Sequence, residues 1–168
     1  MKRIATAVVT ALIALLVQGI AYAAPSHVEW SVRTENSAPD KGTVIVTAKI
    51  ESGWHIYGLD IANPTNEPGV PDATSIEIEP QPGLKIVGPT TTDSQPVVHF
   101  DEFLNLNLPW LQGTVELRRD FELTDGAKGA KVKGYVKYMA CNDNSCTPPA
   151  KYEFDLDFGD MTSPAPAA

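Results

Sequence analysis

The two cysteines of this 168-residue chain, Cys141 and Cys146, are separated by only four residues. The sequence between them, Asn-Asp-Asn-Ser, is polar and small, which is typical of a tight turn. Pro148 and Pro149 follow and restrict the backbone that leaves Cys146. A turn of this length can bring two Cα atoms within the ~4.4–6.8 Å that a disulfide requires. The chain can therefore form one disulfide on a turn.

Such a disulfide has two possible uses, and the residues alone leave both open. As a structural staple, it would close a short loop and stabilise the fold by roughly 2 kcal/mol. As a redox pair, it would exchange with the thiolate of another protein, which requires an accessible sulfur. Alternation along the preceding strand points Tyr138 and Ala140 inward, so we expect Cys141 on the solvent face.

Alternation of apolar and polar side chains with a period of two dominates the chain after its apolar start, and no helical stripe of useful length is present. Turn signals rich in Gly, Pro and Asp separate the alternating segments. The predicted strands are residues 28–33, 43–50, 54–59, 75–78, 84–87, 97–100, 114–123, 131–140 and 152–158. Because each strand has one apolar face, we predict an all-β, antiparallel two-sheet sandwich of about eight or nine strands.

Residues 1–23 have the pattern of a secretory signal peptide. Lys2 and Arg3 precede the apolar segment, and Ala-Tyr-Ala supplies small residues before a cleavage point after Ala23. We expect cleavage rather than a permanent anchor, which leaves a soluble exported domain over 24–161 and a disordered tail over 162–168. Disulfides form in such a compartment.

Acidic residues outnumber basic ones, with 21 Asp and Glu against 13 Lys and Arg and a net charge of −8. Loss of Lys2 and Arg3 with the signal peptide would take the net charge from −8 to −10. Such a surface repels phosphate backbones and anionic lipids, so neither nucleic acid nor a membrane surface is expected as a partner. No later segment approaches the ~20 apolar residues of a spanning helix, so stable membrane insertion after cleavage is not expected.

Three segments together resemble a known family, the amino-terminal periplasmic domain of the thiol:disulfide interchange protein DsbD. The hairpin residues 138–149, Tyr-Met-Ala-Cys and then Cys-Thr-Pro-Pro, are similar to the family's Tyr-x-x-Cys…Cys-x-Pro-Pro pattern. Residues 53–57, Gly-Trp-His-Ile-Tyr, resemble the strand beside those cysteines, and the Asp-Glu-Phe within residues 99–103 resembles the family's cap segment. The resemblance implies an immunoglobulin-like sandwich.

The resemblance also implies an activity, that of a thiol–disulfide oxidoreductase of the protein-disulfide reductase type, acting in the periplasm without a cofactor or a metal. Members of the family take electrons from a thioredoxin-like donor protein and pass them to exported proteins that contain disulfides. The transmembrane and thioredoxin-like domains of the family are not found in this sequence. Either a separate protein acts as the donor, or this chain has a different role.

Seven residues match functional positions of the family. Cys146 matches the cysteine that forms the mixed disulfide with a partner, and Cys141 matches the cysteine that resolves it. Phe103 matches the aromatic cap that shields the sulfurs. The remaining matches line the site, and the two acids among them are placed to manage protons: Asp101, Glu102, Tyr57 and His55.

The sequence departs from the best-known members of the family at two places, since they have one more residue between the cysteines and a tyrosine where His55 stands. The alternative function is a non-catalytic exported sandwich module that binds a protein partner and uses the cysteines as a staple. Trp30, Trp54 and Trp110 are expected in the core. A copper site built from the histidines, Met139 and the cysteines has no ligand spacing that supports it.

Overall fold

Eleven antiparallel strands and no helix make up the part of the chain that the computed structural model describes, residues 26–61, 69–102, 104–127 and 129–158. The strands are β1 (Val28–Ala38), β2 (Lys41–Ile50), β3 (His55–Tyr57), β4 (Ser75–Ile78), β5 (Leu84–Thr92), β6 (Val97–Asp101), β7 (Leu106–Leu111), β8 (Thr114–Leu123), β9 (Ala130–Tyr138), β10 (Ala140–Cys141) and β11 (Ala150–Phe158). Within these ranges there is no helix that could cross a membrane. The predicted signal peptide and tail lie outside the described residues.

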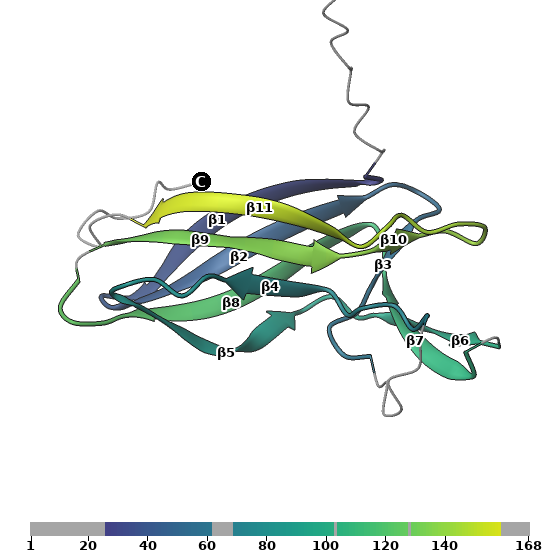
Figure 1. Cartoon of the computed structure of the whole chain (residues 1–168), viewed down its shortest axis with the longest axis horizontal. Helices are drawn as coiled ribbons and strands as arrows, with labels where there is room; N and C mark the ends of the chain where they lie inside the picture. The colour runs from purple at the N-terminus through teal and green to yellow at the C-terminus, as the bar shows by residue number, and fades with distance from the viewer. Residues whose placement is uncertain (1–25, 62–68, 103, 128, 159–168) are drawn as a thin grey trace, which may run out of the picture.

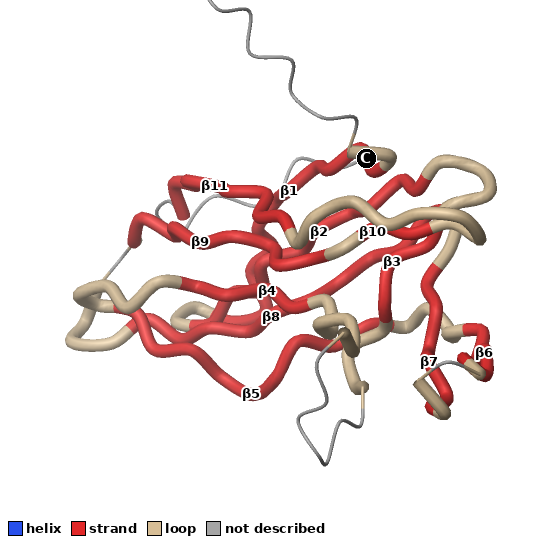
Figure 2. Tube along the Cα trace, turned by 45° about the vertical axis from the view of Figure 1, so that its right-hand side comes forward, coloured by secondary structure: helices blue, strands red, loops and turns tan. Residues whose placement is uncertain are grey.

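Hydrogen bonds join the strands into three sheets, with the strand orders β1-β2-β8-β5, β10-β3-β7-β6 and β11-β9-β4. The first and third sheets stack as the two layers of a sandwich, and the second lies at one end of it, on the right of Figure 1 (Figure 1, Figure 2). Only Met139 separates β9 from β10, so the chain passes from the third sheet to the second at that residue. The predicted all-β, antiparallel, immunoglobulin-like sandwich is confirmed.

The main core lies between the two layers, because β2 and β8 carry apolar side chains at alternate positions. Val46 on β2 and Leu117 and Phe121 on β8 are at most 1% exposed. They belong to one apolar cluster with side chains from the opposite layer, Val132, Val136, Ile76 and Phe154. Full burial of one such side chain contributes about 1.5–3 kcal/mol. This core therefore supplies a rigid support for the sheet at the end of the sandwich.

Strand β7 is not among the predicted strands, because Pro109 interrupts its pattern. A proline lacks the N–H donor that an internal strand position needs, yet β7 lies between β3 and β6. Strand β3 ends at Tyr57, which is opposite Trp110, so no β3 residue faces Pro109. The Pro109 carbonyl accepts a hydrogen bond from Gly58 N at 2.7 Å, just beyond the end of β3. The proline thus costs the ladder no bond.

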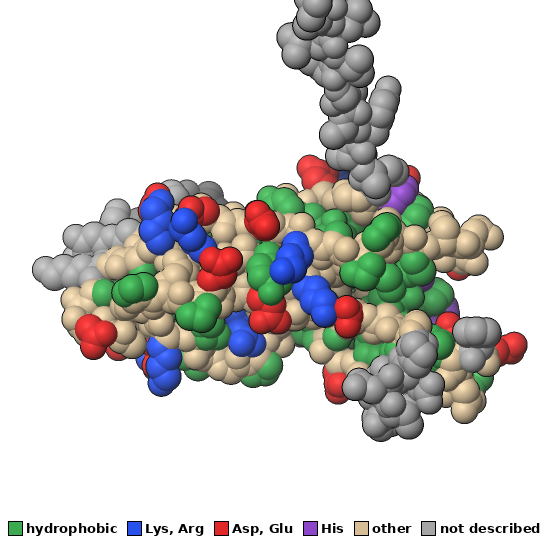
Figure 3. All heavy atoms as spheres, in the orientation of Figure 1, with side chains coloured by type: hydrophobic (Ala, Val, Ile, Leu, Met, Phe, Trp, Pro, Cys, Tyr) green, Lys and Arg blue, Asp and Glu red, His purple; other side chains and the backbone are tan. Residues whose placement is uncertain are grey.

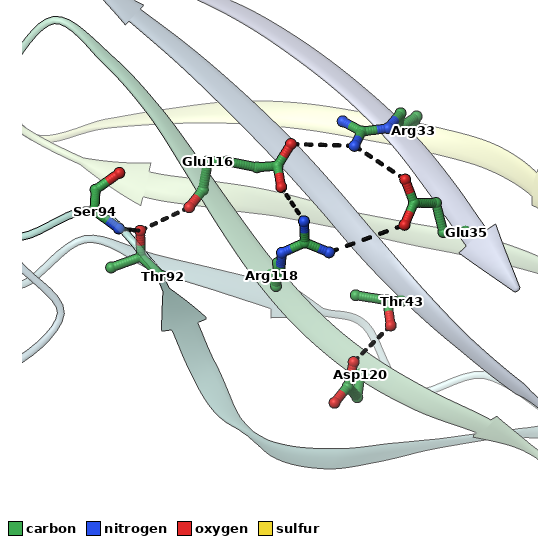
Figure 4. A network of polar contacts seen from close by, with 8 residues as sticks. All are labelled: Arg33, Glu35, Thr43, Thr92, Ser94, Glu116, Arg118 and Asp120. Carbon is green, nitrogen blue, oxygen red and sulfur yellow. Dashed lines mark hydrogen bonds and ion pairs between the residues drawn. The ribbon is translucent and has the colours of Figure 1, made fainter. Parts of the chain in front are cut away.

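Charged side chains of both signs cover the outer faces of the sandwich. On the sheet that contains β1 and β8, Arg33 and Arg118 each pair with both Glu35 and Glu116 (Figure 4). On the other layer, lysines of β9 pair with aspartates of β11, and Figure 3 shows basic and acidic side chains intermixed there. Exposed pairs of this kind contribute about 0–1 kcal/mol each. These faces are therefore solvated surfaces with little part in stability.

Candidate functional site

The two cysteines form a disulfide across a tight turn. Cys141 ends β10, and Cys146 lies opposite it with a Cα–Cα distance of 4.0 Å, slightly shorter than the usual range for a disulfide. Asn142 holds the turn, because its Oδ1 accepts hydrogen bonds from the backbone N of Asn144 at 2.9 Å and of Ser145 at 2.8 Å. Asparagine side chains commonly close turns by such bonds to the backbone. The short polar segment between the cysteines therefore folds locally into a closed hairpin.

The hairpin is attached to β3 on one side and closed on itself on the other. Ala140 and Cys141 pair with Ile56 and His55 of β3. Beyond the turn, Thr147 N donates to the Ala140 carbonyl at 2.8 Å, and Thr147 Oγ1 accepts from Ala140 N at 3.2 Å. These bonds place the disulfide at the edge of the sheet with the strand order β10-β3-β7-β6.

The two cysteines differ in exposure, and the prediction that Cys141 faces solvent is wrong. Cys141 is 1% exposed, whereas Cys146 is exposed. Alternation itself holds, since Ala140 belongs to the main core and Cys141 lies in a second apolar cluster with Tyr57 and Leu108. Residues of β3 and β7 thus cover the face that the local pattern assigned to water. Among the described residues, Cys146 is therefore the cysteine that is exposed to a partner protein, and Cys141 is covered.

A cleft of about 390 Å³ opens beside the disulfide. Six of the seven residues predicted for the site line it, and they come from three segments far apart in the sequence: His55, Tyr57, Asp101, Glu102, Cys141 and Cys146. The seventh, Phe103, lies outside the described residues. The other lining residues are not among those predicted for the site: His99, Phe100, Leu108, Trp110, Asn142 and Asp143.

Tyr57 contacts the disulfide directly. Its buried hydroxyl donates a hydrogen bond to Cys141 Sγ at 3.3 Å. Burial raises the pKa of Tyr57, and the negative charge of Asp101 raises it further. The phenol therefore remains protonated, and a donor, throughout the physiological pH range.

Trp110 lies between two histidines, so it belongs to the cleft rather than to the main core where it was expected. Its ring stacks on His55, with a centroid distance of 3.6 Å and an interplanar angle of 7°. It also stacks on His99, at 3.6 Å and 13°. The alternation of Leu106 and Leu108 with asparagines could have predicted this position for Trp110. In one strand, Leu106, Leu108 and Trp110 have their side chains on the same face.

His55 is 2% exposed, and its Nε2 has no hydrogen-bond partner among the described residues. The pKa of His55 is lowered from 6.5 to about 4, and burial is the largest cause. The positive charge that His99 can carry contributes to the decrease, and the negative charge of Asp143 opposes it. The imidazole beside the disulfide is therefore neutral near pH 7.

Strand β6 forms the rim of the cleft. Asp101 Oδ1 accepts a hydrogen bond from Leu104 N at 2.9 Å and so holds the turn that leaves the strand, while Glu102 is exposed. The strand is an edge of its sheet, and it carries the large apolar side chains that are most exposed in the described residues, Val97, Val98 and Phe100. Apolar side chains exposed together beside a cleft are typical of a protein-contact surface.

The arrangement suits thiol chemistry. Cys146 is exposed, and Cys141 is buried beside a hydroxyl donor, which favours the Cys141 sulfur as the leaving sulfur. Within the described ranges, no group of three or more His, Cys, Asp and Glu side chains is placed to hold a metal ion. His55 and His99 stack on the same indole at 3.6 Å each, which requires opposite faces of Trp110 and keeps the two rings apart.

Comparison with known proteins agrees with this chemistry. The family model of the amino-terminal domain of the thiol:disulfide interchange protein DsbD matches residues 24–157. The chain belongs to this family. Membership in the DsbD amino-terminal domain family implies thiol–disulfide interchange, and the Cys141–Cys146 disulfide fits that chemistry. No curated protein matches the chain in sequence.

The chain is similar to several solved structures at low sequence identity. The amino-terminal periplasmic domain of ScsB from Proteus mirabilis is 15% identical, with a TM-score of 0.57 over 85% of this chain and 50% of that chain. The reduced DsbD amino-terminal domain of Neisseria meningitidis is 20% identical, with a TM-score of 0.49 over 76% of this chain and 85% of that chain. A complex of the DsbD and PilB amino-terminal domains of the same species shows 17% identity, a TM-score of 0.47, and coverage of 79% and 89%.

Proposed function

We propose that the protein carries electrons in the periplasm by thiol–disulfide exchange, with Cys141 and Cys146 cycling between disulfide and dithiol. A thioredoxin-like protein is the electron donor, and exported proteins that contain disulfides are the acceptors. The observation that supports this most is the unequal exposure of the cysteines, because exchange needs one sulfur open to attack. A simple staple has no need of a cleft at its sulfurs.

The exchange proceeds in two balanced halves. A donor thiolate attacks Cys146 Sγ, the S–S bond breaks, and Cys141 leaves with the bonding electron pair as a thiolate. The donor's second thiolate then attacks the donor's first sulfur, which is bonded to Cys146 in the mixed disulfide. This step releases the Cys146 thiolate and leaves the two donor sulfurs joined as a disulfide. In the second half, the Cys146 thiolate attacks an acceptor disulfide, and Cys141 resolves the mixed disulfide to restore the Cys141–Cys146 bond.

Three groups have supporting roles in this proposal. Phe103 shields the sulfurs as a cap, and the exposed apolar side chains of β6 contact the partner. Asp101 and Glu102 at the rim manage protons as thiols form and keep Cys146 from reacting with proteins at random, since nearby carboxylates raise the pKa of a thiol.

Single-cysteine variants test the assignment of the two sulfurs. With oxidised glutathione as the probe, we expect Cys141→Ala to form a stable mixed disulfide on Cys146, detected as an added mass. Cys146→Ala should form the adduct at least about tenfold more slowly, because Cys141 is buried. Equal adduct rates in the two variants would contradict the proposal.

The reduction potential separates the carrier from the stapled module considered above. Equilibration of the mature domain against glutathione or dithiothreitol should give a value above about −250 mV for an exchanging pair. A value below about −300 mV would identify a structural disulfide. In that case, loss of both cysteines should lower the stability by roughly 2 kcal/mol and leave partner binding intact.

A further inference from the structure

The proposed exchange leaves one polar group beside the disulfide without a role, the imidazole of His55. His55 and Cys141 are directly opposite each other in the β3–β10 pair. Residues paired in this way have side chains on the same face, with Cβ atoms about 4.5–5.5 Å apart. Both side chains are almost fully buried, at 2% and 1% exposed.

Among the described residues, packing rather than a hydrogen bond holds the His55 ring. Trp110 stacks on one face, and Tyr57 lies perpendicular to the ring at a centroid distance of 5.3 Å. Its Nε2 is buried without a partner among the described residues, which is unfavourable for a polar atom. In the disulfide state, no described side chain accepts a hydrogen bond from this nitrogen. A charge that appears only when the disulfide opens would provide that partner.

Opening of the disulfide creates such a charge at Cys141. When a partner thiolate bonds to Cys146 Sγ, the Cys141 sulfur keeps the electron pair of the broken bond and becomes a thiolate in a buried position. A buried anion is unfavourable unless it is paired. We infer that His55 is the proton acceptor of this step and that the resulting imidazolium pairs with the Cys141 thiolate. The partner thiol loses one proton to become the attacking thiolate, and His55 binds one, so charge balances.

The groups around the ring determine how readily it binds that proton. Tyr57 on β3 donates a hydrogen bond to the same sulfur. The acids that line the cleft favour an imidazolium, namely Asp101 at the end of β6, Glu102 just after it and Asp143 from the turn. His99 from β6 opposes it. While the disulfide is closed, burial has the largest effect on the pKa of His55 and lowers it. The new thiolate adds an adjacent negative charge, which favours the protonated form of His55 over the neutral form. Because this thiolate arises only in the exchange reaction, the inference rests on the proposed function.

A titration of the parent protein tests the inference without relying on a His55 variant. The ring of His55 is followed by NMR in the disulfide form and in the reduced Cys146→Ala variant, where Cys141 is the single thiol. We expect the pKa of His55 to rise by about one unit or more when the thiol is present. The ring of His27, which contacts Glu51, serves as the reference and should not change. An unchanged pKa of His55 would overturn the inference.

A second measurement uses the thiol itself. In the Cys146→Ala background, the ultraviolet absorbance of the thiolate gives the pKa of Cys141. We expect His55→Phe, which preserves a ring against Trp110, to raise this pKa by about one unit or more. His99→Phe removes the imidazole on the other face of Trp110 and should change it less. Equal changes in the two variants would overturn the inference. Near-ultraviolet circular dichroism verifies that each variant is folded. If His55→Phe does not fold, the NMR titration is the deciding test.

Failure of the inference can be told from failure of the proposed function. If Cys146 exchanges with glutathione but His55→Phe does not change the pKa of Cys141, only the inference is overturned. If the disulfide has the potential of a structural bridge and Cys146 does not exchange, the proposed function fails and the inference falls with it.

Discussion

At the scale of single residues, the hydrogen bond from the Tyr57 hydroxyl to Cys141 Sγ acts directly on the redox balance. A donor stabilises a sulfur that carries negative charge more than a sulfur in a disulfide. The raised pKa of Tyr57 keeps the donor protonated. Tyr57 therefore favours the open state of the cysteine pair.

Removing this hydroxyl should make the disulfide harder to reduce. We expect Tyr57→Phe to lower the reduction potential by about 30 mV, the equivalent of one hydrogen bond of about 1.4 kcal/mol. The matched control is Tyr138→Phe, because Tyr138 is equally buried, at 6% exposed, but lies in the main core. Equilibration of both variants with glutathione measures the potentials. A higher potential in Tyr57→Phe, or equal shifts in the two variants, would contradict this account.

At the scale of elements, the turn after β10 determines how close the two cysteines stay when the disulfide is open. The Asn142 side chain accepts two backbone hydrogen bonds, from Asn144 and Ser145, and so holds the closed geometry. A preorganised turn keeps the open thiols near each other and therefore favours the disulfide.

Loss of that side chain should make the disulfide easier to reduce. We expect Asn142→Ala to raise the potential by about 20 mV, which corresponds to about 1 kcal/mol of turn stability. Asn144→Ala is the matched control, since Asn144 contributes its backbone N–H to the turn. The same glutathione equilibrium measures both. If the control shifted the potential as far as Asn142→Ala does, the side-chain bonds would not be the cause.

Strands with regular alternation could be predicted from the sequence, and irregular ones could not. Strand β4 spans the predicted residues 75–78, and β8 spans the predicted 114–123, because the local pattern of apolar side chains decides both. Strand β7 was missed, since Pro109 is tolerated only where β3 happens to end. The place where a neighbouring strand ends is not a local property of the sequence.

At the scale of the whole molecule, the burial of His55 couples folding to pH. The pKa of His55 is about 4 in the folded protein and near its ordinary value of 6.5 in an unfolded chain. Between these two values the unfolded state binds more protons than the folded state. The contribution to stability is therefore fully present above about pH 6.5, decreases as the pH falls, and is lost by about pH 4 and below.

We expect the free energy of unfolding of the disulfide form to fall by up to about 3 kcal/mol more in the parent than in His55→Phe between pH 7 and pH 4. The comparison with the variant removes the titration of carboxylates that both proteins share. Urea unfolding at the two pH values measures the difference. A fall of the same size in both proteins would show that His55 does not titrate on unfolding.

The sequence by itself determined the class of the fold, the turn that holds the cysteine pair, and, through its resemblance to a family, half of the residues that line the cleft. Alternation and turn residues act over a few neighbours, so they can be recognised without the rest of the chain. Only the tertiary structure decided which sulfur is accessible. Tyr57 and Leu108 cover Cys141, and β7 brings Trp110 between His55 and His99. Burial of that kind depends on strands distant in sequence, and no local pattern contains it.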